Sequence, residues 1–167
     1  LWTKKGEDLP YNGDFIEKFE NGNIKGTGTF VNGQLTGIRI QYYENGTKLT
    51  EKEYKNALPN GKSKEFYENG NLKQEGEFIN NKEDGTWILY YANGYKKAIL
   101  TFDNGIQEGP YYEYDIKGKL TRQYYFKNGK AGYSDEFNYL IKNASEISGR
   151  FIPEEAIELF DKAIEIN

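Results

Sequence analysis

The chain contains no cysteine, no histidine and no methionine among its 167 residues. Without cysteine there is no disulfide framework and no thiol nucleophile. Without cysteine and histidine, the Ser-His-Asp and Cys-His constellations and the usual zinc sites are excluded. No apolar run approaches the roughly 20 residues that span a bilayer, so we expect no membrane insertion. We therefore predict no catalytic, cofactor-binding or metal-binding residues.

Aliphatic residues are also scarce, and aromatic residues take their place. Hydrophobic residues make up 37% of the chain and aromatic residues 16%, with 15 Tyr and 10 Phe. The mean hydropathy is -0.88. Because each ring buries a large area, rings can supply a core where Leu and Val do not. This composition favours a thin structure, one sheet deep.

The net charge of -4 is spread unevenly along the chain. From Ser134 onward, eight acidic residues stand against three basic ones, so the rest of the chain is close to neutral. Binding to nucleic acid requires a net basic face, and this chain has none, so we expect no nucleic-acid partner. The chain starts at Leu1 rather than Met, so we expect a fragment or a processed protein.

The sequence repeats every 24 residues, five times. The units begin at Gly13, Gly37, Gly61, Gly85 and Gly109. Turn pairs follow at Asn21-Gly22, Asn45-Gly46, Asn69-Gly70, Asn93-Gly94 and Lys117-Gly118. A later aromatic recurs at Phe30, Tyr54, Phe78, Phe102 and Phe126. Such a period is typical of an array in which each unit contacts mainly its neighbours.

Each unit is predicted to be a β-hairpin. In the third unit, Asn69-Gly70 indicates a two-residue type I′ turn between strands at Lys62–Glu68 and Asn71–Ile79. A second loop at Asn80–Asp84 leads to the next unit. This register pairs Glu68 with Asn71, Tyr67 with Leu72, and Ser63 with Gly76.

Side-chain alternation then assigns residues to the two faces of the sheet. One face, predicted to be the buried one, holds Ser63, Glu65, Tyr67, Leu72, Gln74, Gly76 and Phe78, with Phe15, Phe19, Ile24, Phe30, Trp87, Tyr91, Phe102, Tyr111, Leu120 and Phe126 in other units. Gly28 and Gly76 leave room for a large ring from a neighbouring unit. The second unit is expected to be looser, because Arg39 and Lys48 stand in core columns and its second loop reads Asn-Ala-Leu-Pro-Asn.

The opposite face carries a second aromatic stripe. It contains Ile40, Tyr42, Phe66, Ile88, Tyr90, Tyr112 and Tyr114. One interpretation is that these residues cover the back of the sheet and stack on each other. The other is a binding strip, since exposed rings with polar rims mark binding sites. The candidate partner-binding residues are Tyr42, Phe66, Tyr90, Tyr112 and Tyr114.

The repeat pattern stops at Ser134, where helical spacing begins. Ser134 is a good N-cap, and Pro153 suits a first helical position. We predict a C-terminal α-helical hairpin that either caps the array or begins a second, helical-repeat domain. The expected fold is mainly β: an elongated single-layer antiparallel β-hairpin array with this hairpin. The expected organisation is an N-terminal edge at 1–12, five repeats at 13–132, and the helical segment at 133–167.

The units resemble the bacterial variant of the membrane occupation and recognition nexus (MORN) repeat. The match lies in Gly61, Phe66-Tyr67, Glu68-Asn69-Gly70, Leu72-Lys73, Gly76 and Phe78, and it extends over 13–132. The resemblance implies a twisted single-layer β array with a binding or scaffolding role. Some bacterial relatives look like antitoxin or immunity components, and others appear exported. Ala156, Phe160 and Ala163 are similar to the second helix of a tetratricopeptide repeat.

The leading functional hypothesis is a non-enzymatic protein–protein interaction module. Its specific form is a bacterial antitoxin or immunity protein whose partner is a toxin. The alternative is an exported bacterial surface protein that binds host or envelope ligands, protein or glycan, through the aromatic stripe. Carboxylate pairs such as Glu75 and Glu77 are interpreted as solvated strand charges rather than as an acid–base pair. The sequence leaves both the cytoplasm and export open.

Overall fold

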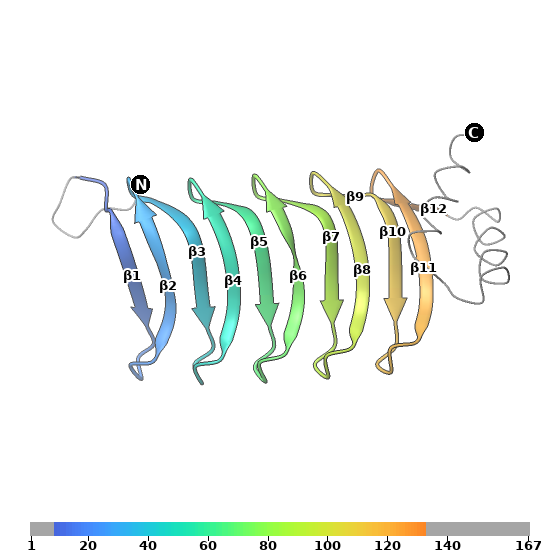
Figure 1. Ribbon diagram of the computed structural model, residues 1–167, viewed down its shortest axis with the longest axis horizontal. Helices are drawn as coiled ribbons and strands as arrows, with labels where there is room; N and C mark the ends of the chain where they lie inside the picture. The colour runs from blue at the N-terminus through green and yellow to red at the C-terminus, as the bar shows by residue number, and fades with distance from the viewer. Residues whose placement is uncertain (1–8, 133–167) are drawn as a thin grey trace.

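A computed structural model describes residues 9–132, which form one antiparallel sheet of twelve strands. Figure 1 shows the strands side by side along the long axis of the molecule. The strands are β1 Gly13–Lys18, β2 Ile24–Val31, β3 Gln34–Tyr42, β4 Lys48–Lys55, β5 Leu58–Phe66, β6 Leu72–Ile79, β7 Lys82–Tyr90, β8 Lys96–Asp103, β9 Ile106–Gln107, β10 Gly109–Tyr114, β11 Leu120–Lys127 and β12 Lys130–Gly132.

The strands follow one another across the sheet in chain order, except that the short β9 pairs only with β8. Each hairpin therefore borders only the preceding and the following hairpin. The predicted single-layer antiparallel hairpin array is confirmed for this part of the chain.

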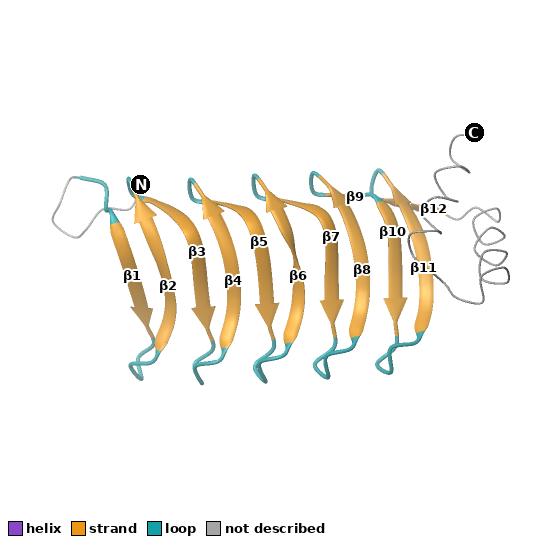
Figure 2. Cartoon of the chain, viewed as in Figure 1, coloured by secondary structure: helices purple, strands orange, loops and turns teal. Residues whose placement is uncertain are grey.

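The predicted fold class is wrong in its helical part. Residues 9–132 consist of strands and loops and contain no helix (Figure 2). The fold is thus a single antiparallel sheet, and an α-helical hairpin is not an element of it. The segment on which that hairpin was placed lies outside the described residues.

The turns at the Asn-Gly pairs differ from the predicted type I′ geometry. The Tyr67 N–H donates to the Asn71 carbonyl at 2.8 Å, and the Gly70 N–H donates to the Tyr67 carbonyl at 2.9 Å. Only Gly70 has a positive φ, of 86°, whereas Asn69 does not. The Asn69 side-chain oxygen accepts from the Asn71 N–H at 3.0 Å. The turn is therefore a three-residue loop with a bulge, in which Asn acts through its side chain.

The type I′ turns are instead at the other edge of the sheet, in the loops between units. Asn80 and Asn81 have φ values of 50° and 66°, and they connect the register partners Ile79 and Lys82. The predicted loop at Asn80–Asp84 is thus only a two-residue turn, and β7 begins at Lys82. In the second unit, Ala57 occupies the same left-handed position with φ 65°.

Register inside the hairpins is partly as predicted. Ser63 pairs with Gly76, as expected, but a bulge between Glu65 and Phe66 brings Phe66 opposite Leu72. The predicted pairs Tyr67–Leu72 and Glu68–Asn71 are wrong, because the longer loop adds a residue. The same shift occurs at this place in every hairpin.

Most of the buried residues lie on one face, which we call the core face. It is defined by Phe15, Phe30, Leu35, Ser63, Phe78, Trp87, Leu100 and Phe102. Trp87 is 6% exposed, and its ring lies edge-on to Phe78 with centroids 5.0 Å apart. A Cβ at Gly76 would collide with the Trp87 ring, so Gly76 makes room for a ring from the next unit, as predicted. Lys48, expected in a core column, is exposed and pairs with Glu51.

Candidate partner-binding surface

The opposite face, called the stripe face, presents four rings at equivalent positions. Tyr42, Phe66, Tyr90 and Tyr114 are the last residues of β3, β5, β7 and β10. Each follows the register shift of its hairpin, and each is half-buried. Equivalent residues in successive hairpins are two strands apart, or about 9.5 Å. The structure thus brings four of the five predicted residues into one line.

The fifth predicted residue, Tyr112, does not belong to the accessible line. Its side chain is buried, at 5% exposure, and burial raises the pKa of its hydroxyl. Alternation along the strand placed it on the correct face, but it lies inward from the strand end. Tyr112 is therefore a packing residue in this structure.

Tyr90 is the most constrained ring of the stripe. Its hydroxyl donates to Glu75 Oε1 at 2.8 Å. Burial, and then the hydrogen bond and negative charge of Glu75, raise the pKa of Tyr90 to about 12. Burial also raises the pKa of Tyr114. Both hydroxyls therefore remain neutral at physiological pH and keep their protons as donors.

The row next to the ring line is not continuously apolar. Ile40 and Ile88 are separated along it by Glu51, Lys64 and Glu75, which follow one another in register. Lys64 Nζ lies 4.0 Å from Glu75 Oε2. The second row is therefore charged at its centre and does not continue the apolar character of the ring line.

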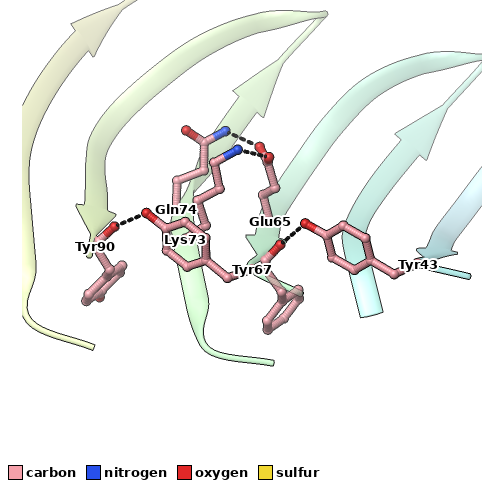
Figure 3. A network of polar contacts seen from close by, with 7 residues as sticks. Tyr43, Glu65, Tyr67, Lys73, Gln74 and Tyr90 are labelled. Atoms are coloured by element: carbon pink, nitrogen blue, oxygen red, sulfur yellow. Dashed lines mark hydrogen bonds and ion pairs between the residues drawn. The ribbon is translucent and has the colours of Figure 1, made fainter. Parts of the chain in front are cut away.

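A ladder of tyrosine hydroxyls positions the ring line (Figure 3). Tyr43 donates to the Phe66 carbonyl at 2.8 Å, and Tyr67 to the Tyr90 carbonyl at 2.7 Å. Tyr91 donates to the Tyr114 carbonyl at 2.9 Å. Each donor thus holds the backbone of the stripe residue in the next hairpin. Phe19 occupies the corresponding position in the first hairpin and has no hydroxyl, so Tyr42 receives no such bond.

An asparagine ladder runs parallel to the tyrosine ladder at the same edge. The side-chain amides of Asn69 and Asn71 both donate to the Ala92 carbonyl, at 3.0 and 2.7 Å. Asn93 donates likewise to the Ile116 carbonyl at 3.0 Å. These bonds tie each loop to the loop of the following hairpin. From the sequence, these Asn and Tyr residues were predicted to be turn and core residues. The recurrence of Tyr-X-Asn-Gly in successive units is the sequence pattern that could have indicated the links between hairpins.

The described part of the chain offers no metal site. Among residues 9–132, no cluster of three or more Asp or Glu side chains is placed to hold a metal ion. That part of the chain also has no helix long and apolar enough to cross a membrane. One open depression of about 390 Å³ lies between the charged strands of the stripe face. The surface geometry is therefore suited to contact rather than to enclosure.

The profile of the MORN repeat variant family matches residues 11–32, 35–56, 59–80 and 83–104. Each matched stretch is one hairpin with its turn, and together the four cover more than half of the chain. The chain therefore belongs to the MORN repeat variant family, a class of β-hairpin repeat proteins. The hairpin of β10 and β11 lies outside the matched stretches but has the same register shift and turn. Comparison with curated proteins gives no significant match.

Proposed function

We propose that this protein is a non-enzymatic protein-binding module whose contact surface is the ring line of the stripe face. The observation that carries the proposal is the alignment of Tyr42, Phe66, Tyr90 and Tyr114 at strand ends on one face of the sheet, against which residues 9–132 place no second layer. The family is compatible with such a role.

Physical chemistry supports a contact role for these rings. Aromatic side chains offer large contact area with few rotatable bonds, so they lose little entropy on binding. The ladder fixes the backbone beneath three of the four rings, which further lowers the ordering cost. Exposed Ile16 and Ile38, at 63% and 52%, extend the apolar area toward the N-terminal end of the same face.

The specific form of the proposal is a bacterial antitoxin or immunity protein that neutralises a toxin. It rests on the resemblance of the units to such relatives. The alternative is an exported surface protein that uses the ring line for host or envelope ligands, including glycans, since rings with hydroxyls also suit sugars.

The test is to change Tyr42 and Tyr90 together to Ser and to compare binding quantitatively. Proteins captured by the tagged chain are identified by mass spectrometry, produced in pure form and titrated by calorimetry. We expect the double variant to bind at least about tenfold more weakly, or roughly 1.4 kcal/mol. Tyr95→Ser is the control, because Tyr95 is 54% exposed in a loop and lies outside the ring line.

Unchanged binding, together with a large loss of stability in the double variant, would show that the ring line is structural. A glycan array probed with the same variants distinguishes the exported surface protein from the antitoxin or immunity protein. Ring-dependent glycan signal without a protein partner would favour the surface-protein form over the antitoxin form.

A further inference from the structure

The core face has a polar notch in the second hairpin, where the other hairpins are apolar or small. Arg39 on β3 and Lys52 on β4 are register partners there. The corresponding pairs elsewhere are Phe15–Gly28, Ser63–Gly76, Trp87–Leu100 and Tyr111–Tyr124. Two like charges directly opposite each other destabilise a sheet. The notch therefore contains an electrostatic cost that none of the four corresponding pairs carries.

The two cations differ in how they are neutralised. Arg39 Nη2 lies 3.1 Å from Glu17 Oε2. Lys52 forms no ion pair with any carboxylate among residues 9–132. Its ammonium lies 4.8 Å from the centroid of the Phe78 ring, where a cation–π interaction partly compensates its charge. Lys52 thus holds the notch's uncompensated positive charge.

Glu65, a core-face carboxylate that lines the same hollow, is occupied by other groups. Glu65 Oε1 accepts from Lys73 at 2.6 Å, and Glu65 Oε2 accepts from Gln74 at 2.8 Å (Figure 3). Glu83 on β7 lines the same hollow as Lys52, beside its register partner Phe78, and it forms no ion pair within residues 9–132. Neither carboxylate forms an ion pair with Lys52.

Further donors without acceptors lie beside Lys52. Ser63, its register partner on β5, is only 6% exposed, and its hydroxyl makes no hydrogen bond within the described residues. Trp87 Nε1 is also buried, and it has no hydrogen-bond partner among residues 9–132. Lys52, Ser63 and Trp87 all line one hollow of about 270 Å³, walled by Phe78, Leu89, Leu100 and Phe102. Unpaired donors in a partly apolar hollow favour an oxygen-bearing anion.

We propose that this notch binds the carboxylate of an acidic peptide segment, with Lys52 as its ion-pair partner and the Ser63 hydroxyl as a hydrogen-bond donor. The Lys52 ammonium, which has no ion-pair partner within residues 9–132, matches one carboxylate, and the ring walls suit the carbon chain that carries it. The site is separate from the ring line, since it lies on the opposite face of the sheet.

The test uses the full chain with Trp2→Phe, which leaves Trp87 as the single tryptophan. The probe is a hexaglutamate peptide with blocked ends, followed by Trp87 fluorescence and by amide chemical shifts. Hexaglutamine is the neutral control. We expect saturable changes at Trp87 and Ser63 with hexaglutamate only, weakening as ionic strength rises.

Lys52→Gln is expected to weaken hexaglutamate binding at least about fivefold, the effect of losing one direct charge pair. Lys62→Gln is the matched control, because Lys62 is an exposed lysine on the neighbouring strand and on the stripe face; we expect less than about a twofold change there. Circular dichroism and melting of both variants verify the fold. Equal losses in the two variants, or no saturable change at Trp87, would overturn the proposal. Equal response to inorganic phosphate would overturn its assignment to a carboxylate.

Discussion

At the scale of single residues, the hydroxyl of a tyrosine decides how tightly successive hairpins are joined. Tyr67 follows the last residue of β5, and its hydroxyl donates to the Tyr90 carbonyl of the next hairpin. The bond stabilises the position of a stripe residue as well as the array. A phenylalanine at this place, as at Phe19, supplies the ring without the link.

Tyr67→Phe should therefore lower the free energy of unfolding by about 0.5–1.5 kcal/mol, the net value of one such hydrogen bond. Urea unfolding followed by circular dichroism measures the change. Tyr95→Phe is the control, since Tyr95 is exposed and its hydroxyl makes no hydrogen bond in residues 9–132. If both substitutions cost the same, the ladder does not contribute to stability.

The raised pKa of Tyr90 predicts loss of stability in alkali. The native state retains this proton to about pH 12, whereas an unfolded tyrosine loses it near pH 10. The contribution of the protonated Tyr90 hydroxyl to the free energy of unfolding is thus complete below about pH 10 and is lost as the pH rises through about 12. Melting temperatures between pH 9 and 12 should fall less steeply in Tyr90→Phe than in the unmodified chain. A residual fall is expected, because the pKa values of Tyr111, Tyr112 and Tyr114 are also raised.

At the scale of the hairpin, the two edges of the sheet use different turns for different purposes. The edge with the Asn-Gly pairs has longer loops, whose side chains bond to the next hairpin. The other edge has two-residue turns with both residues at positive φ. Ala57 is the one residue at such a position that is neither Gly nor Asn in the described chain, and its left-handed backbone is strained.

Ala57→Gly should consequently stabilise the protein by about 0.5–1 kcal/mol, since glycine adopts this backbone without a Cβ clash. Thermal and urea unfolding provide the measurement. Ala92→Gly is the matched control, because Ala92 lies in an opposite-edge loop and lacks a positive φ. We expect it to be neutral or slightly destabilising. A destabilised Ala57→Gly variant would contradict the strain argument.

At the scale of the whole molecule, the array is a chain of neighbours without a shared central core. Every strand pairs only with adjacent strands, so a perturbation at one end reaches the other end only through the intervening hairpins. Repeat proteins of this kind unfold in segments rather than as a unit. The first hairpin is also the one that lacks the tyrosine link.

Phe15→Ala should accordingly increase hydrogen exchange in β1 and β2 while leaving β7 and β8 nearly unchanged. Phe15 packs on Phe30 within the first hairpin, with centroids 4.9 Å apart, and contacts the second hairpin through Arg39, whose guanidinium carbon lies 5.9 Å from the Phe15 centroid. Trp87→Ala is expected to accelerate exchange in the sixth to eighth strands instead, because Trp87 bridges Phe78 and Phe102. Uniform acceleration throughout by either substitution would indicate one cooperative unit and would contradict this picture.

The sequence alone determined the repeat length, the hairpin nature of each unit, the core face and the pairing of Ser63 with Gly76. These features depend on alternation along a strand and on residues that tolerate a turn, both of which are local properties. The role of Gly76 beneath a neighbouring ring was predictable for the same reason, because a missing side chain is visible in the sequence.

Only the tertiary structure decided which edge has the type I′ turns, since Asn-containing pairs occur at both edges. The choice depends on bonds such as that from Asn69 to the Ala92 carbonyl, which join residues 23 positions apart. Three other features have the same origin: the bulge that brings Phe66 opposite Leu72, the burial of Tyr112, and the lack of an ion pair at Lys52 within residues 9–132. Each results from contacts between adjacent strands and hairpins, where the neighbour's backbone, rather than the residue's own sequence, sets the partner and the exposure.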